Sequence, residues 1–184
     1  MPLEIETKFK VSDPGRMRRN ITRIGARLMS RALEQDVYYG KEEKGFGGTV
    51  IRLRKINGKR GVFTVKLSVS RKAYGVFKVK EELEVCIEDV KTFGRMLPAL
   101  GLVPRFVKEK RRESYALGKA KILLDELPFV GWYLEIEGTR KDITRLAKRL
   151  GLDIKKGTAE TYSAIFNRYR AVKKIKRGDM VFVK

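Results

Sequence analysis

The sequence predicts an α+β fold in which about eight strands pair mostly as antiparallel hairpins, accompanied by three or four helices. Stretches such as LEIETKFKV (3–11) alternate strictly between apolar and charged residues, which is the period of a half-buried strand. Asn57-Gly58 is a strong signal for a hairpin turn between two such stretches. Other stretches carry a single apolar stripe at helical spacing, which predicts amphipathic helices packed against the sheet.

The predicted elements follow one another along the whole chain. Asp13-Pro14 starts the first helix, because aspartate caps helix N-termini and proline suits the first helical position. The apolar face of this helix consists of Met17, Ile21, Ile24 and Leu28. Further helices are predicted at 88–100, 140–150 and about 158–169. Strands are predicted at 3–11, 33–39, 49–56, 61–69, 76–85, 103–117, 121–127 and 131–138.

The length of 184 residues suits one domain with a short appendage. We predict a domain at 1–170 and a basic tail at 171–184, which forms either an extra strand or a disordered arm. The apolar MVFV segment of this tail (180–183) is a candidate edge strand for a homodimer. A charged, glycine-rich loop is predicted at 40–48.

Composition limits the chemistry that the chain can perform. The sequence has no histidine, which excludes Ser-His-Asp and Cys-His catalysis and histidine metal ligands. The single cysteine, Cys86, excludes an internal disulfide and a cysteine-rich zinc site, and we predict a buried, inert thiol there. Acid–base or metal chemistry must therefore come from Asp, Glu, Lys, Tyr or water.

The charge is strongly positive, with 43 Lys and Arg against 22 Asp and Glu, a net charge of +21. Such a charge attracts nucleic acid, an anionic membrane surface or polyphosphate, or it is a solubility trait. A role in solubility suits the arginines on the outer side of the first helix, which are Arg16, Arg18, Arg19 and Arg23. No stretch approaches the ~20 apolar residues of a membrane span, and no signal peptide is evident, so a soluble, cytoplasmic protein is expected.

Charged residues share one face of nearly every predicted strand. This face is either solvated on an open sheet or rolled inward as the lumen of a barrel. Like charges are paired two residues apart, as in Arg52 and Arg54, and such pairs ~7 Å apart repel unless an opposite charge lies between them. Carboxylates suit Mg²⁺ or Mn²⁺, and arginines suit phosphate oxygens. A metal-bound polyphosphate needs both kinds of side chain, carboxylates for the metal and arginines for the phosphates.

These residues resemble the CYTH superfamily, whose members include class IV adenylyl cyclases and thiamine triphosphatases and are also called triphosphate tunnel metalloenzymes. Glu4-x-Glu6-x-Lys8 looks like the ExExK signature of that superfamily. ExExK alone is a weak motif, but the resemblance covers residues 3–166. Further motifs follow in the order of the family: Asp36-Val37-Tyr38-Tyr39, Arg52-x-Arg54, Thr64-x-Lys66, Glu82-x-Glu84, Lys110-x-Arg112-x-x-Tyr115, Asp125, Gly131-x-Tyr133-x-Glu135-x-Glu137 and Tyr162-Ser163.

The resemblance implies an eight-stranded antiparallel barrel with helices outside and a triphosphate in its tunnel. It implies Mg²⁺ or Mn²⁺ ligands at Glu4, Glu6, Glu135 and Glu137, with Asp125 assisting and Glu82 and Glu84 as supporting acids. It implies triphosphate binding by Lys8, Arg52, Arg54, Lys66, Lys110 and Arg112. The sequence departs from the family pattern at Gly40, where an acid is frequent, and in the loop that follows.

The resemblance implies an enzyme and leaves two reactions open. Tyr38 with Lys66 resembles a pair that activates water, which favours hydrolysis of thiamine triphosphate, a nucleoside triphosphate or inorganic triphosphate; water activated by the cation is the alternative. The alternative reaction is that of a class IV adenylyl cyclase, which converts ATP into cyclic AMP and pyrophosphate. A non-catalytic module that binds polyphosphate or RNA is an alternative of another class.

Overall fold

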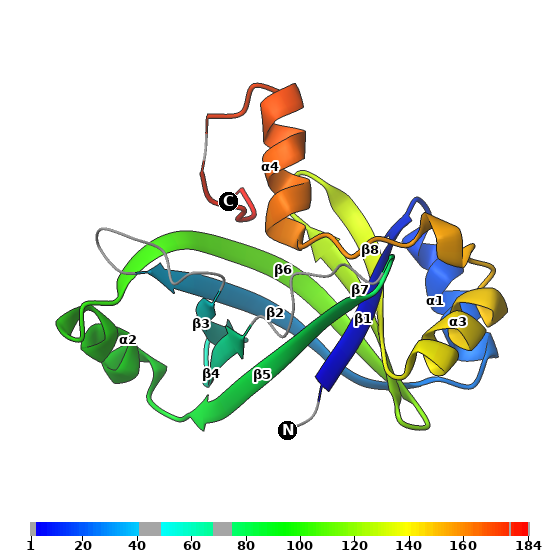
Figure 1. The fold of residues 1–184 in the computed structure, drawn as a ribbon, viewed down its shortest axis with the longest axis horizontal. Helices are drawn as coiled ribbons and strands as arrows, with labels where there is room; N and C mark the ends of the chain where they lie inside the picture. Colours follow the sequence, from blue (N-terminus) through cyan, green and yellow to red (C-terminus); the bar gives the residue numbers. More distant parts are fainter. Residues whose placement is uncertain (1–2, 41–48, 68–74, 177, 184) are drawn as a thin grey trace.

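In the computed structural model, which describes residues 3–40, 49–67, 75–176 and 178–183, eight strands close into an antiparallel barrel (Figure 1). Their order around the barrel is β1-β5-β4-β3-β2-β6-β7-β8. The predicted eight-stranded barrel with helices outside is thus confirmed. The strands are β1 (Leu3–Val11), β2 (Arg27–Gly40), β3 (Val50–Ile56), β4 (Arg60–Leu67), β5 (Lys78–Ile87), β6 (Val103–Leu117), β7 (Ala120–Leu127) and β8 (Gly131–Glu137).

The strand pairings differ in length around the barrel. β2 pairs with β6 along its whole length, from Arg27 to Gly40. Among the described residues, β1 pairs with β8 through residues 6–11 and with β5 through residues 3–6. The contact between β1 and β5 is therefore a short one, and it is the contact that closes the ring.

Four α-helices lie outside the barrel among the described residues (Figure 1). They are α1 (Pro14–Arg23), α2 (Val90–Ala99), α3 (Arg140–Arg149) and α4 (Tyr162–Val172), with a 3-10 turn, η1 (Ile154–Lys156), after α3. Each α-helix begins after a side chain that accepts a hydrogen bond from a backbone N–H of the first turn: Asp13, Asp89, Thr139 and Thr161. None of the described helices is long and apolar enough to cross a membrane.

The main apolar core lies between the barrel wall and helices α1 and α3, which run side by side in Figure 1. Ile21 of α1 and Leu146 of α3 belong to the same cluster as Leu134 and Ile136 of β8, and all four are 0% exposed. Because Leu134 and Ile136 point outward into this core, the residue between them, Glu135, faces the lumen.

The first helix is shorter than predicted. α1 ends at Arg23, and Gly25 then adopts a left-handed φ of 81°, a conformation that favours glycine after a helix. Leu28, predicted on the helix face, lies in β2 and is 39% exposed. Pairing with β6 starts β2 at Arg27, six residues before the predicted strand, because this long-range pairing overrides the local helical spacing.

The last helix starts later than predicted, at Tyr162, where Thr161 caps it. Thr158 instead exchanges two backbone hydrogen bonds with Lys8 of β1, which holds the preceding segment in an extended conformation. The predicted loop at 40–48 lies outside the described residues apart from Gly40, the last residue of β2. The end of the strand predicted at 61–69 also lies outside them.

The prediction of a buried thiol at Cys86 is wrong, because Cys86 is exposed. It shares its face of β5 with Glu82 and Glu84, and not with the apolar residues that alternate with them. That apolar face is itself partly open, since Leu83 and Val85 are 41% and 53% exposed. The helices therefore cover the barrel unevenly.

The last described residues of the C-terminal tail, 178–183, pack against β6, whereas Ala171 and Val172 belong to α4. The backbone N–H of Met180 donates to the carbonyl of Val107 at 2.9 Å, and the Met180 carbonyl accepts from Glu109 at 2.8 Å. Met180 is 0% exposed and belongs to an apolar cluster with Tyr162 of α4. The tail thus adds a short parallel bridge to the edge of β6 that lies under α4.

Candidate functional site

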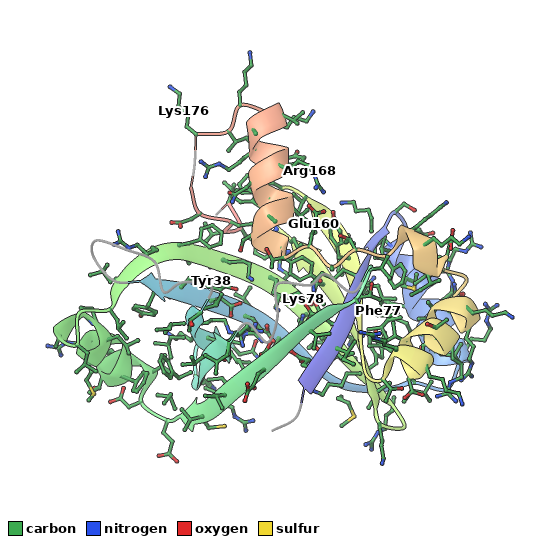
Figure 2. All side chains as sticks on the ribbon, in the orientation of Figure 1. Tyr38, Phe77, Lys78, Glu160, Arg168 and Lys176 are labelled. Atoms are coloured by element: carbon green, nitrogen blue, oxygen red, sulfur yellow. The ribbon has the colours of Figure 1, made fainter. Side chains whose placement is uncertain are left out.

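The charged faces of the strands line the lumen of the barrel, and the structure brings the predicted site residues together there. Figure 2 shows how densely side chains such as Tyr38 and Lys78 fill this space. Strand register places opposite charges beside each other, as with Arg112 and Asp125. The predicted residues in the lumen are Glu4, Glu6 and Lys8 (β1), Tyr38 (β2), Arg52 and Arg54 (β3), Lys66 (β4), Glu82 and Glu84 (β5), Lys110 and Arg112 (β6), Asp125 (β7), and Glu135 and Glu137 (β8).

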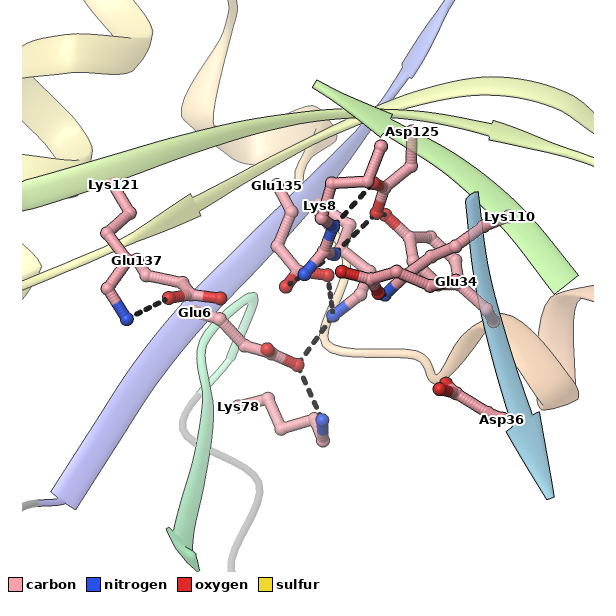
Figure 3. A network of polar contacts seen from close by, with 12 residues as sticks. Glu6, Lys8, Glu34, Asp36, Lys78, Lys110, Lys121, Asp125, Glu135 and Glu137 are labelled. Carbon is pink, nitrogen blue, oxygen red and sulfur yellow. Dashed lines mark hydrogen bonds and ion pairs between the residues drawn. The ribbon is translucent and has the colours of Figure 1, made fainter. Parts of the chain in front are cut away.

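Three buried carboxylates form an acidic cluster where β1 meets β8 (Figure 3). One oxygen each of Glu6, Glu135 and Glu137 lies within 4.8 Å of the other two. Lys8 lies between two of them, with its amine 2.5 Å from Glu6 and 3.1 Å from Glu135. Lys78 of β5 also pairs with Glu6, at 2.5 Å. The cluster is therefore enclosed by protein and partly neutralised by lysines.

Burial and mutual repulsion perturb the pKa values around this cluster. Burial, a hydrogen bond with Glu82 and the charge of Glu137 raise the pKa of Glu4 to about 9. Burial and Glu135 also raise the pKa of Glu137. Burial opposes the ionised form of Glu135 too, but Lys8 and Arg112 hold its pKa well below the usual range. Lys121 pairs with Glu137 at 3.3 Å and Arg112 with Glu135 at 3.5 Å, so cationic side chains compensate part of the negative charge.

This donor set fits a divalent cation. It consists of carboxylate oxygens alone, which hard cations such as Mg²⁺ and Mn²⁺ prefer. The raised pKa of Glu4 and of Glu137 indicates that added positive charge at this point would stabilise the ionised carboxylates. Glu6, Glu135 and Glu137 are the residues whose geometry fits best, with Glu4 next to them on β1.

Asp125 lies apart from the acidic cluster and is engaged differently. Its two oxygens accept hydrogen bonds from the Arg112 guanidinium at 2.7 and 2.6 Å. The Tyr162 hydroxyl of α4 donates to the same carboxylate at 2.9 Å, and Asp125 is 0% exposed. In this arrangement Asp125 orients Arg112. Glu82 and Glu84 likewise form ion pairs with basic side chains, Glu82 with Lys66 and Glu84 with Arg52.

A basic wall faces the acidic cluster across the lumen. Arg54 holds Asp36 through two hydrogen bonds of 2.7 and 3.0 Å and pairs with Glu34 at 2.9 Å. Lys110 pairs with Glu34 at 3.0 Å. Arg52 binds Thr64 at 2.8 Å, but its buried Nε has no hydrogen-bond partner among the described residues. A buried guanidinium donor without an acceptor is expected where an anion belongs.

Tyr38 and Lys108 form a separate pair within this wall. The Lys108 amine donates a hydrogen bond to the Tyr38 hydroxyl and lies 3.6 Å from Asp36. Burial, followed by the charges of Arg52 and Arg54, lowers the pKa of Lys108 to about 8 in spite of Asp36. Burial and Asp36 raise the pKa of the Tyr38 hydroxyl.

Lys66, the lysine that the resemblance pairs with Tyr38, is bound to Glu82. The contacts of the described residues join Tyr38 to Lys108 and do not join it to Lys66. Burial and Arg52 lower the pKa of Lys66 as well. Both lysines therefore have the lowered pKa that suits a general base, but Lys108 is the one that contacts the Tyr38 hydroxyl.

The structure also brings residues into the site to which the sequence assigned no role. Glu34, Lys78 and Lys108 continue the two-residue period of their strands and could have been found by extending it. Asp36 stands in the quoted Asp-x-Tyr-Tyr motif without a role. Tyr162 comes from α4, and the sequence carries no signal that a helix would reach Asp125.

Known proteins resemble this chain over most of its length. A Methanocaldococcus jannaschii protein named "Putative adenylate cyclase MJ0240" is 27% identical over 148 residues, which is 80% of this chain and 83% of that protein. The PH1012 protein of Pyrococcus horikoshii OT3 has a solved structure with a TM-score of 0.74 at 27% identity, covering 86% of this chain and 96% of that chain.

The fold also resembles that of HpAC1 from Hippeastrum, a protein described as having a dominant triphosphatase activity. That structure has a TM-score of 0.62 at 14% identity and covers 91% of this chain and 96% of that chain. The CYTH domain model matches residues 2–161, which include every strand of the barrel and its charged lumen. The chain therefore belongs to the CYTH domain family.

Proposed function

We propose that this protein is an enzyme that hydrolyses a triphosphate compound bound in the barrel lumen, with the help of Mg²⁺ or Mn²⁺. One observation carries the proposal: a buried cluster of three carboxylates faces a wall of buried arginines and lysines inside one enclosed lumen. The acidic cluster alone would repel phosphate. A basic wall that bound phosphate without a cation would not need the acidic cluster opposite. A cation–triphosphate complex complements both at once.

The carboxylates would hold the cation. Glu6, Glu135 and Glu137 are placed for this, and Glu4 joins them from the same strand as Glu6. Glu82 and Glu84 support the site from β5 through their ion pairs with Lys66 and Arg52. When bound, the cation would neutralise negative charge on the phosphate oxygens during the reaction.

The basic wall would hold the phosphates. Arg52 offers a buried Nε that has no hydrogen-bond partner within the described part of the chain, and Arg112 is held in one orientation by Asp125. An arginine fork that binds a carboxylate through two hydrogen bonds can bind a phosphate with the same geometry. The proposed triphosphate-binding residues are Lys8, Arg52, Arg54, Lys66, Lys110 and Arg112.

Tyr38 with Lys108 would assist the attacking water. A water molecule loses one proton as its oxygen bonds to the terminal phosphorus and the bond from that phosphorus to the oxygen of the leaving diphosphate breaks. When Lys108 is neutral, the Tyr38 hydroxyl that it contacts would donate its own proton to Nζ and take the proton of the water. The lowered pKa of Lys108, about 8, supports this role near neutral pH. Lys66 remains the alternative lysine for Tyr38.

Cyclisation of ATP is the second candidate, supported by the adenylate cyclase name of the M. jannaschii relative. It would use the same cation and phosphate contacts with the ribose hydroxyl as nucleophile. Hydrolysis is preferred because the Tyr38–Lys108 pair offers a proton acceptor for water, and HpAC1, which shares the fold, is described with a dominant triphosphatase activity.

Product analysis tests the proposal. The purified protein is given ATP, thiamine triphosphate or inorganic triphosphate with Mg²⁺ or Mn²⁺, and orthophosphate, pyrophosphate and cyclic AMP are measured. We expect orthophosphate release that Glu6→Gln abolishes and that Glu88→Gln, an exposed glutamate outside the barrel, leaves unchanged. Pyrophosphate with cyclic AMP would identify the cyclase instead. Absence of turnover with all three substrates in the folded wild type would contradict both.

A further inference from the structure

The lumen does not account for the positive charge of the protein. The described lumen acids are Glu4, Glu6, Glu34, Asp36, Glu82, Glu84, Asp125, Glu135 and Glu137. The described bases that form ion pairs with them are Lys8, Arg52, Arg54, Lys66, Lys78, Lys108, Lys110, Arg112 and Lys121. The two sets balance, so the excess that gives the chain a net charge of +21 lies elsewhere.

Much of that excess lies on the solvent-facing sides of α1 and α3. Hydrogen bonds from Asn20 to the Leu150 carbonyl and from Arg149 to the Ile24 carbonyl, at 3.4 and 2.9 Å, join the two helices. Within their bounds the only acid is Asp142, which already pairs with Arg145 at 2.7 Å. The exposed basic residues are Arg16, Arg19 and Arg23 of α1 and Arg140, Lys141, Arg145, Lys148 and Arg149 of α3.

A groove of about 740 Å³ runs along α3 toward the start of β5, and we call it the α3 groove. Its apolar lining consists of half-buried Phe77, Leu152 and Ile154. Lys141, Arg145 and Lys148 line it from α3, and the Arg140 guanidinium lies 5.7 Å from the centre of the Phe77 ring. Figure 2 shows Phe77 on the side of the barrel where α3 lies. The exposed acid Asp153 also lines the groove, so the apolar lining is bordered by four cationic side chains and one carboxylate.

We propose that the α3 groove binds single-stranded nucleic acid on the outside of the barrel. Flat bases stack on aromatic and aliphatic surface, while the phosphates follow a row of lysines and arginines. Lys141, Arg145 and Lys148 are three or four residues apart on α3, which places them on one helix face at a rise of about 4.5–6 Å from one to the next. This binding goes beyond the proposed reaction, because it uses none of the lumen residues.

A membrane surface fits the same charges less well. Insertion into the headgroup region needs large apolar side chains that protrude beside the basic residues. Among the residues that the structure describes, the exposed large apolar ones are Leu28, Met29, Leu33, Leu83, Val85, Met96, Leu100, Phe129, Val172 and Val183, and none of these lies on α1, on α3 or in the α3 groove. The apolar surface here is recessed, where a planar base can reach it and a bilayer cannot.

Fluorescence anisotropy with a labelled uridine 20-mer tests the proposal. The RNA carries a 5′-hydroxyl end, so it offers no triphosphate to the lumen. We expect Lys141→Gln/Arg145→Gln/Lys148→Gln to weaken binding at least tenfold and to lower the slope of log K against log salt by about 2, at about 0.7 for each lost phosphate contact. Phe77→Leu should weaken binding by about fivefold or more with little change in the slope.

The matched control removes the same charge at the β3–β4 hairpin, with Lys55→Gln/Lys59→Gln/Arg60→Gln, all exposed residues. The proposal is overturned if this control weakens binding as much as the α3 variant, if Phe77→Leu has no effect, or if the wild type does not bind the RNA. Binding to phosphatidylserine vesicles that RNA does not compete away would assign the charge to a membrane instead.

Two further measurements separate this proposal from the proposed reaction. The α3 triple variant should turn over a small triphosphate like the wild type, because its substitutions lie outside the lumen. Glu6→Gln should bind the uridine 20-mer like the wild type. If RNA binding followed the lumen variant, the nucleic acid would be entering the barrel and the α3 groove would not be its site.

Discussion

The amine of Lys108 on β6 donates a hydrogen bond to the hydroxyl of Tyr38 on β2, inside the barrel. The register of the two strands makes this contact, because Lys108 lies opposite Asp36, two residues before Tyr38 on the same face. The amine also lies 4.8 Å from the centre of the Tyr38 ring. This geometry makes Lys108 the partner of Tyr38, whereas the family resemblance pairs Tyr38 with Lys66.

Replacing each lysine by methionine separates their roles. We expect Lys108→Met to lower kcat by about 10²-fold or more with little change in KM, since a lost proton acceptor typically costs that much. Lys66→Met should mainly raise KM, because it removes a phosphate contact. Steady-state kinetics on the best substrate measures both. A large loss of kcat in Lys66→Met beside a nearly normal Lys108→Met would assign the base to Lys66.

The pH profile of kcat follows from the same lysine. A base must be unprotonated to accept a proton, so the rate should rise with pH and level off above the pKa of Lys108, which is about 8. Lys108→Arg keeps the positive charge but stays protonated, and we expect it to remove this rise along with most of the activity. A wild-type profile that is flat between pH 6 and about 9 would argue against the assignment.

The cation-free protein should lose stability as the pH rises. The pKa of Glu4 is raised from 4.5 to about 9 in the folded state, so its contribution to stability is present below 4.5 and lost as the pH rises toward about 9. Glu4→Gln should flatten this dependence, and Glu88→Gln should not. Thermal unfolding in EDTA across this pH range measures the effect. Saturating Mn²⁺ should reverse it, since a bound cation favours the ionised carboxylates.

Asp125 should matter for stability as well as for activity. Asp125→Asn leaves Arg112 buried without its bidentate partner, and the nearest ion pair left among the described residues is the one with Glu135, at 3.5 Å. Breaking a buried ion pair from one side typically costs about 3–5 kcal/mol in free energy of unfolding. Tyr162→Phe removes a single hydrogen bond to the same carboxylate and should cost about 1 kcal/mol. Urea denaturation compares the two, and equal effects would mean that Asp125 does not hold Arg112.

The barrel and most of the lumen could be predicted from the sequence because one simple period governs both. Glu135 points inward for the same reason that Leu134 points outward, and this alternation needs no knowledge of neighbouring strands. The role of Asp125 could not be predicted in this way. Its partners Arg112 and Tyr162 come from β6 and α4, and only the folded chain brings them together.

Local patterns failed where distant pairing decided the conformation. Leu28 has the spacing of a helix face, but the long pairing of β2 with β6 places it in a strand. Cys86, for which a buried thiol is predicted, lies on the same face of β5 as Glu84 and is exposed, while Leu83 and Val85 lie on the opposite face. The partner of Tyr38 also depended on strand register, since Lys66 and Lys108 lie on different strands.

The short contact between β1 and β5 determines where the barrel opens locally most easily. Local opening costs least where the fewest backbone hydrogen bonds must break, so amide hydrogens of residues 3–6 should exchange with solvent sooner than those in the β2–β6 ladder. Inside the lumen, the ion pair of Glu6 with Lys78 spans this same junction. A ligand that binds both strands would stabilise the β1–β5 pairing. Its binding would therefore be measured as slower amide exchange at that junction.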